Sequence, residues 1–204
     1  MTNNQPIFQP VFGEDWQKLP KVMHKHYANR PFCNDSTFVE GTMDIRYSKL
    51  LWFFMPIFRL FGALVPYQGQ NIPVTVEYFS EKNSPAFCFK RIFYFPGKKP
   101  YPFNSKIFPI KTHEVAEFVR FGLGWQMYFF YENEKVILKH KRYIWKIGKI
   151  TIPLPLNLIL GTNYCEEITI SDDEFYMDLQ MRHKIFGLMF QYKGNFKIVK
   201  YAGE

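Results

Sequence analysis

The alternation of side chains between positions 175 and 182 constrains the fold of this chain more than any other feature. One set of alternate positions holds Phe175, Met177, Leu179 and Met181, and the intervening set holds Tyr176, Asp178, Gln180 and Arg182. A period of two places successive side chains on opposite faces of a β-strand. Together with the strand-like runs around it, from Thr151 to Val199, this pattern predicts that the last third of the chain is antiparallel β-sheet.

The aromatic content also favours a sheet. Phe, Trp and Tyr make up 20% of the 204 residues, with 23 Phe and 13 Tyr. Aromatic and β-branched side chains pack well on a pleated, half-buried surface. Because so many bulky side chains exceed what a minimal core requires, two alternatives stay open. They fill an aromatic-rich core, or some of them line a cavity or face a membrane.

The N-terminal region predicts an arm, a helix and a strand. Residues 1–13 read as an arm. Leu19-Pro20 suits a helix entry with proline in the first turn, so we expect a short helix that begins near Asp15 or Pro20 and ends near Tyr27. Loose alternation from Phe38 to Tyr47 predicts the first strand.

The stretch from Leu50 to Val65 is hydrophobic nearly all round and follows Ser48, a suitable N-cap. Because it is shorter than the roughly 20 apolar residues that span a bilayer, we do not expect a transmembrane helix. The alternatives are a core or lid helix and a segment that lies in a membrane interface. The candidate lid or membrane residues are Trp52, Phe53, Phe54, Phe58 and Arg59.

Turn signals divide the middle of the chain into strands and lead to a fold prediction. The predicted strands span residues 71–80, 87–95, 101–110, 123–131 and 135–144. The segment 113–121 fits a short helix or a strand equally well. We predict an α+β fold over residues 14–204, as one domain. Its antiparallel sheet of about eight or nine strands is strongly curved, or a half-open barrel, wrapped around the apolar helix, with a short N-terminal helix outside.

The positive charge is concentrated in one segment. The chain has a formal net charge of +8, and residues 82–149 hold 14 Lys and Arg against 4 acidic residues. Such a segment could meet an anionic membrane surface or an acidic partner, or its lysines could simply guard strand edges and keep the protein soluble. Nucleic acid is an unlikely partner because no nucleic-acid-binding signature is present.

Several classes of site are not expected. Cys33, Cys88 and Cys165 are far apart and odd in number, which argues against a disulfide scaffold or a zinc site and favours a reduced, cytoplasmic setting. The first residues lack the basic start and apolar run of a signal peptide. The usual dinucleotide, phosphate-loop and hydrolase motifs are missing, so we expect no cofactor and no metal.

Two charged residues on otherwise apolar strand faces are the main candidates for a binding site. Arg91 shares a face with Phe87 and Phe89, and Glu166 shares a face with Ile168. A charged side chain that points inward needs a partner, so we predict a buried pair between Arg91 and Glu166. The alternative is a structural salt bridge or a solvent-exposed arginine.

The chain resembles DUF4166, a bacterial family of unknown function, from about Phe12 to Val199. The resemblance rests on the loop-to-strand segment 69–76, on the segment 89–93, which is similar to a W-x-R-x-F motif with Phe89 in place of Trp, and on a C-terminal signature. The signature residues are Pro153, Glu166, Gly187, Tyr192, Gly194 and Phe196. The family's domain often follows an oxidoreductase-like domain or membrane segments, so the resemblance implies an accessory or ligand-binding role.

We therefore expect a non-catalytic module that binds a lipid-like or other hydrophobic small molecule, accessory to an oxidoreductase. Its candidate ligand-binding residues are Arg91, Glu166, His26 and Tyr192. The first alternative is a small-molecule enzyme that uses Glu166, His26 or His183 for acid–base chemistry. The second is a protein at the membrane periphery, attached through residues 50–65 and the basic segment. The oligomeric state stays open.

Overall fold

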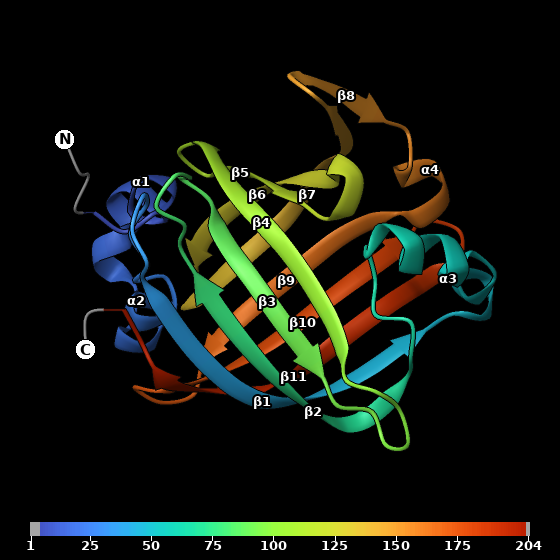
Figure 1. Ribbon diagram of the computed structural model, residues 1–204, viewed down its shortest axis with the longest axis horizontal. Coiled ribbons are helices and arrows are strands. Elements are labelled where there is room, and N and C mark those ends of the chain that lie inside the picture. The colour runs from blue at the N-terminus through green and yellow to red at the C-terminus, as the bar shows by residue number, and fades with distance from the viewer. Residues whose placement is uncertain (1–4, 203–204) are drawn as a thin grey trace.

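The computed structural model describes residues 5–202 and shows an antiparallel β-barrel (Figure 1). Its strands are β1 (Ser36–Tyr47), β2 (Gly69–Phe79), β3 (Phe87–Phe93), β4 (Tyr101–Lys111), β5 (Glu114–Phe118), β6 (Leu123–Glu132), β7 (Lys135–Ile147), β8 (Ile150–Leu154), β9 (Thr162–Thr169), β10 (Glu174–His183) and β11 (Gly187–Lys200). The predicted alternation in β10 is confirmed, because Phe175, Met177, Leu179 and Met181 all line interior cavities.

The barrel is closed, which corrects the prediction of a half-open sheet. Pairing follows the order β6-β5-β4-β3-β2-β1-β11-β10-β9-β7, and β6 also pairs with β7, so ten strands form a ring. β8 pairs with β7 alone and lies outside the ring. The strand count is higher than the predicted eight or nine, and the fold is mostly β rather than α+β. Closure leaves no unpaired edge in the ring.

Successive connections alternate between the two ends of the barrel. The connections β1–β2, β3–β4, β5–β6, β7–β9 and β10–β11 lie at one end, together with α3 (Lys49–Phe61), η2 (Arg120–Gly122) and α4 (Asn157–Leu160). We call this the α3 end. The α2 end carries α1 (Gln9–Phe12), η1 (Gly13–Lys18) and α2 (Lys21–His26). α2 confirms the predicted N-terminal helix.

The helix α3 covers its end of the barrel instead of lying inside it, which corrects the predicted arrangement. Ser48 caps it through a bond from the Leu51 N–H, as expected, but Gly62 in the left-handed region ends it before Val65. One stripe faces the barrel, and it consists of Leu51, Met55 and Phe58. Since only one stripe is buried, the helix cannot serve as the centre of the sheet. No helix in residues 5–202 is long and apolar enough to cross a membrane.

Aromatic packing closes the α2 end. Phe8 and Phe12 are fully buried, and the Phe8 ring lies 5.0 Å from the ring of Phe87 and 5.3 Å from that of Phe129 in the barrel wall. Residues 1–4 of the predicted arm lie outside the described residues. The described part of it therefore supplies core side chains that plug the barrel.

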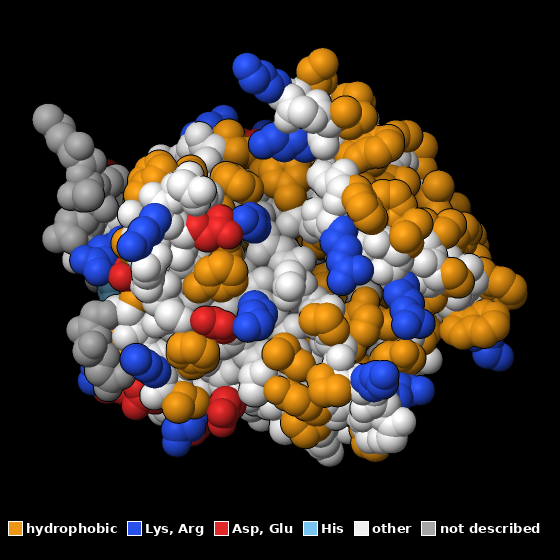
Figure 2. Space-filling model, in the orientation of Figure 1, with side chains coloured by type: hydrophobic (Ala, Val, Ile, Leu, Met, Phe, Trp, Pro, Cys, Tyr) orange, Lys and Arg blue, Asp and Glu red, His pale blue; other side chains and the backbone are white. Residues whose placement is uncertain are grey.

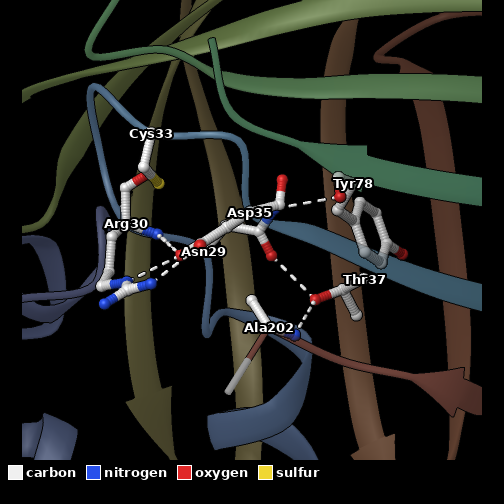
Figure 3. Close-up of polar contacts among 7 residues, drawn as sticks. All are labelled: Asn29, Arg30, Cys33, Asp35, Thr37, Tyr78 and Ala202. Carbon is white, nitrogen blue, oxygen red and sulfur yellow. Dashed lines mark hydrogen bonds and ion pairs between the residues drawn. The ribbon is translucent and has the colours of Figure 1, made fainter. Parts of the chain in front are cut away.

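A polar network beside this plug joins the segment after α2 to β1, β2 and Ala202 (Figure 3). The Asn29 amide donates to the carbonyls of Tyr78 and Asp35, and the Thr37 hydroxyl donates to Asn29 Oδ1 at 2.7 Å. The Ala202 N–H in turn donates to the Thr37 hydroxyl. Because these groups satisfy one another in a buried place, the α2 end is held by directional bonds as well as by packing.

Gly41 of β1 and Gly194 of β11 allow these two strands to lie close together. Gly194 gives a test of the register in which they pair. A Cβ at Gly194 would lie 1.9 Å from the Thr42 carbonyl oxygen in β1. Gly194→Ala should therefore lower the free energy of unfolding by about 3 kcal/mol, measured by urea denaturation. Asn195→Ala, at the exposed neighbouring position, is the control. Equal stability of the two variants would contradict this register.

Candidate functional site

Two small cavities lie inside the barrel and share Arg91 and Tyr192 in their walls. The larger has a volume of about 60 Å³ and lies toward the α3 end, where Phe58, Leu64 and Leu160 of the helical cover complete its lining. The smaller has a volume of about 40 Å³ and is lined by residues nearer the α2 end, including Tyr78 and Phe175. Both walls are mostly apolar, so the few polar groups in them define the chemistry.

Arg91 is the centre of the main polar cluster. Its side chain is 12% exposed, and its guanidinium donates to the Phe103 carbonyl at 3.3 Å, to the Ser105 hydroxyl and to Glu117 Oε1 at 3.3 Å. The guanidinium carbon also lies 4.2 Å from the centre of the Phe103 ring and 4.8 Å from that of Phe89. These contacts hold the charge in a fixed position.

Glu117 is the buried partner of Arg91. It lies on β5 opposite Trp125 of β6, and the Trp125 indole N–H donates to its Oε2 at 3.0 Å. The carboxylate therefore accepts bonds on both oxygens and balances the arginine charge. A charge pair that is satisfied in this way can remain ionised inside an apolar barrel.

The predicted pair between Arg91 and Glu166 does not form. Arg91 points into the barrel as its alternation predicts, but Glu166 points outward and bonds Lys135 at 3.1 Å. The inward positions of β9 are Asn163, Cys165 and Glu167. The reason is the register, since Cys165 lies between Leu138 of β7 and Leu179 of β10, which line the same cavity.

The wall of the larger cavity also contains polar atoms without partners. Tyr143 is 4% exposed, and neither its hydroxyl nor the Asn163 amide oxygen has a hydrogen-bond partner of normal geometry among the described residues. Burial raises the pKa of Tyr143, so its hydroxyl is neutral and able to donate. Buried unsatisfied groups are rare in native proteins and call for an explanation.

A second polar cluster lies beside the smaller cavity. The Tyr27 hydroxyl donates to Glu167 Oε2 at 2.6 Å, and burial raises the pKa of Glu167 to about 7. His26, a predicted ligand-binding residue, contacts the rings of Tyr78 and Phe175, and burial lowers its pKa to about 3. His26 is therefore a neutral core side chain under the plug.

The remaining predicted residues are dispersed. Tyr192 lines both cavities, and burial raises its pKa, opposed by the Arg91 charge. His26 contacts Phe175, near the start of β10, whereas His183 is the last residue of that strand. At a rise of roughly 3.3 Å per residue, Phe175 and His183 lie about 26 Å apart. The structure therefore brings no two of His26, His183 and Glu166 together for acid–base chemistry.

The predicted residues of α3 divide between the two sides of the helix. Phe58 lines the larger cavity, and Phe54 is half-buried. Trp52 and Phe53 are 60% and 72% exposed, and Arg59 is exposed as well. The helix is thus a cover on its inner side and an apolar surface on its outer side.

Sequence reasoning missed most of the polar residues that the structure places in the interior. They include Ser105, Glu117, Trp125, Tyr143, Asn163 and Glu167. The sequence could not predict an inward Glu117, because the segment 113–121 fitted a helix and a strand equally well. No group of three or more His, Cys, Asp or Glu side chains that could hold a metal ion occurs within residues 5–202.

The raised pKa of Glu167 predicts a specific pH dependence of stability. Between about pH 4.5 and pH 7 the folded protein keeps a proton on Glu167 that the unfolded chain releases. The free energy of unfolding contributed by this group therefore falls, by about 3 kcal/mol, as the pH rises through that window. Glu167→Gln cannot ionise and should lack the loss.

Urea denaturation of both proteins across this pH range measures the difference. The lowered pKa of His26 makes its contribution to the free energy of unfolding change with pH in the opposite direction. This contribution is the same in both proteins and cancels in the comparison. Parallel stability curves for the wild type and Glu167→Gln would show that Glu167 titrates normally.

Comparisons with known proteins identify the family and little else. No curated protein sequence matches the chain. An S-type phycobiliprotein lyase, CPES from Guillardia theta, is similar with 4% identity over 83% of this chain and 87% of that chain, at a TM-score of 0.32. The dehydratase domain from the CurJ module of the curacin polyketide synthase is similar with 10% identity over 80% and 76%, at 0.24. At such low TM-scores neither likeness informs function. Residues 19–196 match the profile of a family described as a domain of unknown function, DUF4166, and the chain belongs to this family.

Proposed function

We propose that the barrel is a non-catalytic binding module for one small hydrophobic molecule with a polar end. The observation that carries this proposal is the pair of polar positions in an otherwise apolar cavity. Arg91 with Glu117 forms one, and the unpartnered hydroxyl of Tyr143 near Asn163 forms the other. Ligand sites typically combine an apolar wall with a few placed polar groups.

The charge balance favours a neutral polar end over an ionised one. Glu117 already neutralises Arg91, and Arg91 and Glu117 are the only two charged residues in the wall of the larger cavity within residues 5–202. A carboxylate or ammonium on the ligand would thus be an unpaired charge in an apolar interior, which is strongly unfavourable. A hydroxyl, carbonyl or amide can bond the Arg91–Glu117 pair or Tyr143 and Asn163 without that penalty.

The cavity volume sets a condition on the ligand. At roughly 10–15 Å³ per water, a cavity of about 60 Å³ holds about five water molecules, well below the size of a lipid-like ligand. A larger ligand therefore requires the cover to move. The N-cap Ser48 donates its N–H to the Met189 carbonyl of β11 at 2.8 Å. Within the described residues no hydrogen bond joins residues 49–62 to a barrel strand, so beyond this first residue α3 is held by packing. We infer that ligands enter at the α3 end.

Removal of the interior ion pair tests the polar anchor. The double variant Arg91→Met/Glu117→Gln removes both charges together, so that neither is left unpaired. It should weaken binding of a long-chain alcohol by about 10- to 100-fold, the loss of one or two bonds to charged groups. Displacement of a polarity-sensitive fluorescent probe measures the affinity.

The matched control is Lys135→Met/Glu166→Gln, which removes an ion pair on the outer wall. The wild type should bind the long-chain alcohol more tightly than the fatty acid of equal length. No saturable binding, or an equal loss in both double variants, would refute the proposal. Native mass spectrometry of the purified protein, with extraction of what stays bound, identifies the natural ligand class.

Tyr143 separates a binding role from a structural one. Its hydroxyl has no hydrogen-bond partner of normal geometry among the described residues, so Tyr143→Phe should raise the stability of the empty protein by about 1 kcal/mol and also weaken binding of the alcohol. Tyr27→Phe is the control, because that buried hydroxyl bonds Glu167 and its loss should destabilise the protein. Thermal unfolding with and without the alcohol gives both quantities. A destabilised Tyr143→Phe variant would indicate a structural role.

A further inference from the structure

The α3 end of the barrel has an unusual surface for a protein in water. Most of the exposed large apolar side chains in residues 5–202 lie in its connections or at the adjoining strand ends. They include Trp52, Phe53, Ile57, Phe121, Ile185 and Phe186. Exposed apolar surface on this scale marks an interaction site.

Contacts between the connections make this surface continuous around the barrel mouth. The rings of Phe61 in α3 and Phe121 in η2 lie 5.9 Å apart, and the Trp145 indole donates to the Phe121 carbonyl at 2.8 Å. On the other side, His183 at the end of β10 bonds the Leu158 carbonyl of α4. The apolar side chains thus belong to one surface rather than to separate loops.

The charges of this surface have one sign. The connections at the α3 end span residues 48–68, 94–100, 119–122, 148–161 and 184–186, and they contain no Asp or Glu. The exposed basic side chains in these connections and at the adjoining strand ends include Lys49, Arg59, Lys98, Lys99, Arg120, Lys146, Lys149, Arg182 and Lys184.

None of these nine basic side chains pairs with a carboxylate among the described residues, although twelve ion pairs form elsewhere. Acidic residues such as Glu81, Asp172 and Asp173 lie in connections at the α2 end. In Figure 2 the acidic side chains of the visible face lie toward α1 and α2, whereas the half toward α3, α4 and β8 shows apolar and basic side chains.

We propose that the α3 end docks on an anionic lipid bilayer. The occupant follows from the chemistry, since unpaired Lys and Arg attract anionic headgroups and exposed Trp, Phe, Leu and Ile side chains insert among the acyl chains. A second copy of the chain would bring this surface against itself and oppose like charges, which makes self-association unfavourable.

Docking in this orientation turns the cover of the larger cavity toward the lipid. The outer side of α3 would enter the bilayer, while its inner stripe of Leu51, Met55 and Phe58 faces the barrel. Binding to the bilayer does not depend on a ligand in the cavity, so this proposal and the proposed function can fail separately.

Flotation with vesicles tests the proposal. The wild type should bind vesicles of phosphatidylcholine that contain phosphatidylserine, and salt should weaken the binding because it screens the charges. Lys49→Glu/Lys184→Glu should lower the partition coefficient by at least about 30-fold, from two lost attractions near the surface. Phe53→Ser/Ile185→Ser, at positions 72% and 82% exposed, should lower it by at least about 100-fold.

Controls at the α2 end make the orientation testable. Lys82→Glu/Lys200→Glu changes the net charge by the same amount at exposed positions away from the α3 end and should bind nearly as well as the wild type. Brominated acyl chains should quench the fluorescence of the exposed Trp52 and Trp145 more than that of Trp16 in the plug.

Three results would overturn the proposal. These are no binding to the phosphatidylserine vesicles at low salt, equal losses in the two pairs of lysine variants, and a concentration-dependent dimer whose formation the Phe53→Ser/Ile185→Ser variant abolishes. The last result would assign the surface to a second copy of the chain.

Discussion

The pairing of β6 with β7 is the interaction on which the rest of the structure depends. β7 also pairs with β9, so this one strand joins the N-terminal half of the sheet to the C-terminal half and closes the ring. Asn133 and Glu134 in the tight turn between β6 and β7 adopt the positive φ angles of a primed hairpin turn, whose twist suits the barrel. Without this closure the inner faces of ten strands would have no common interior.

Closure also explains how two polar pairs can exist inside an aromatic core. Arg91 of β3 and Glu117 of β5 meet over β4 on the inner wall, and the Trp125 indole also bonds Glu117. Tyr27, next to α2, bonds Glu167 of β9. Tyr143 differs because its hydroxyl is buried without such a partner. This contrast between satisfied and unsatisfied groups in one interior is the reason that the proposed ligand contact is placed at Tyr143.

The sequence predicted local structure better than it predicted which strands and side chains lie next to one another. The alternation in β10 and the two strands predicted over residues 123–131 and 135–144 follow from short-range patterns, and both were confirmed. The choice between Glu166 and Glu167 could not follow from such patterns, because adjacent residues in a strand face opposite ways and only cross-strand partners decide which faces in. Glu117, the partner of Arg91, could not be predicted either, because their contact also depends on which strands are neighbours. The apolar pattern of α3 could not show that this helix covers an end of the barrel.

The ends of the described chain both lie at the α2 end. Ile7 bonds the Asn29 carbonyl there, and Ala202 bonds Thr37 on the same network (Figure 3). The described chain thus begins and ends on the side opposite α3. A fused partner or an affinity tag can be carried at either terminus while the mouth of the barrel stays unobstructed. With the α3 end docked on a bilayer, as proposed, such a partner would lie on the aqueous side of the barrel.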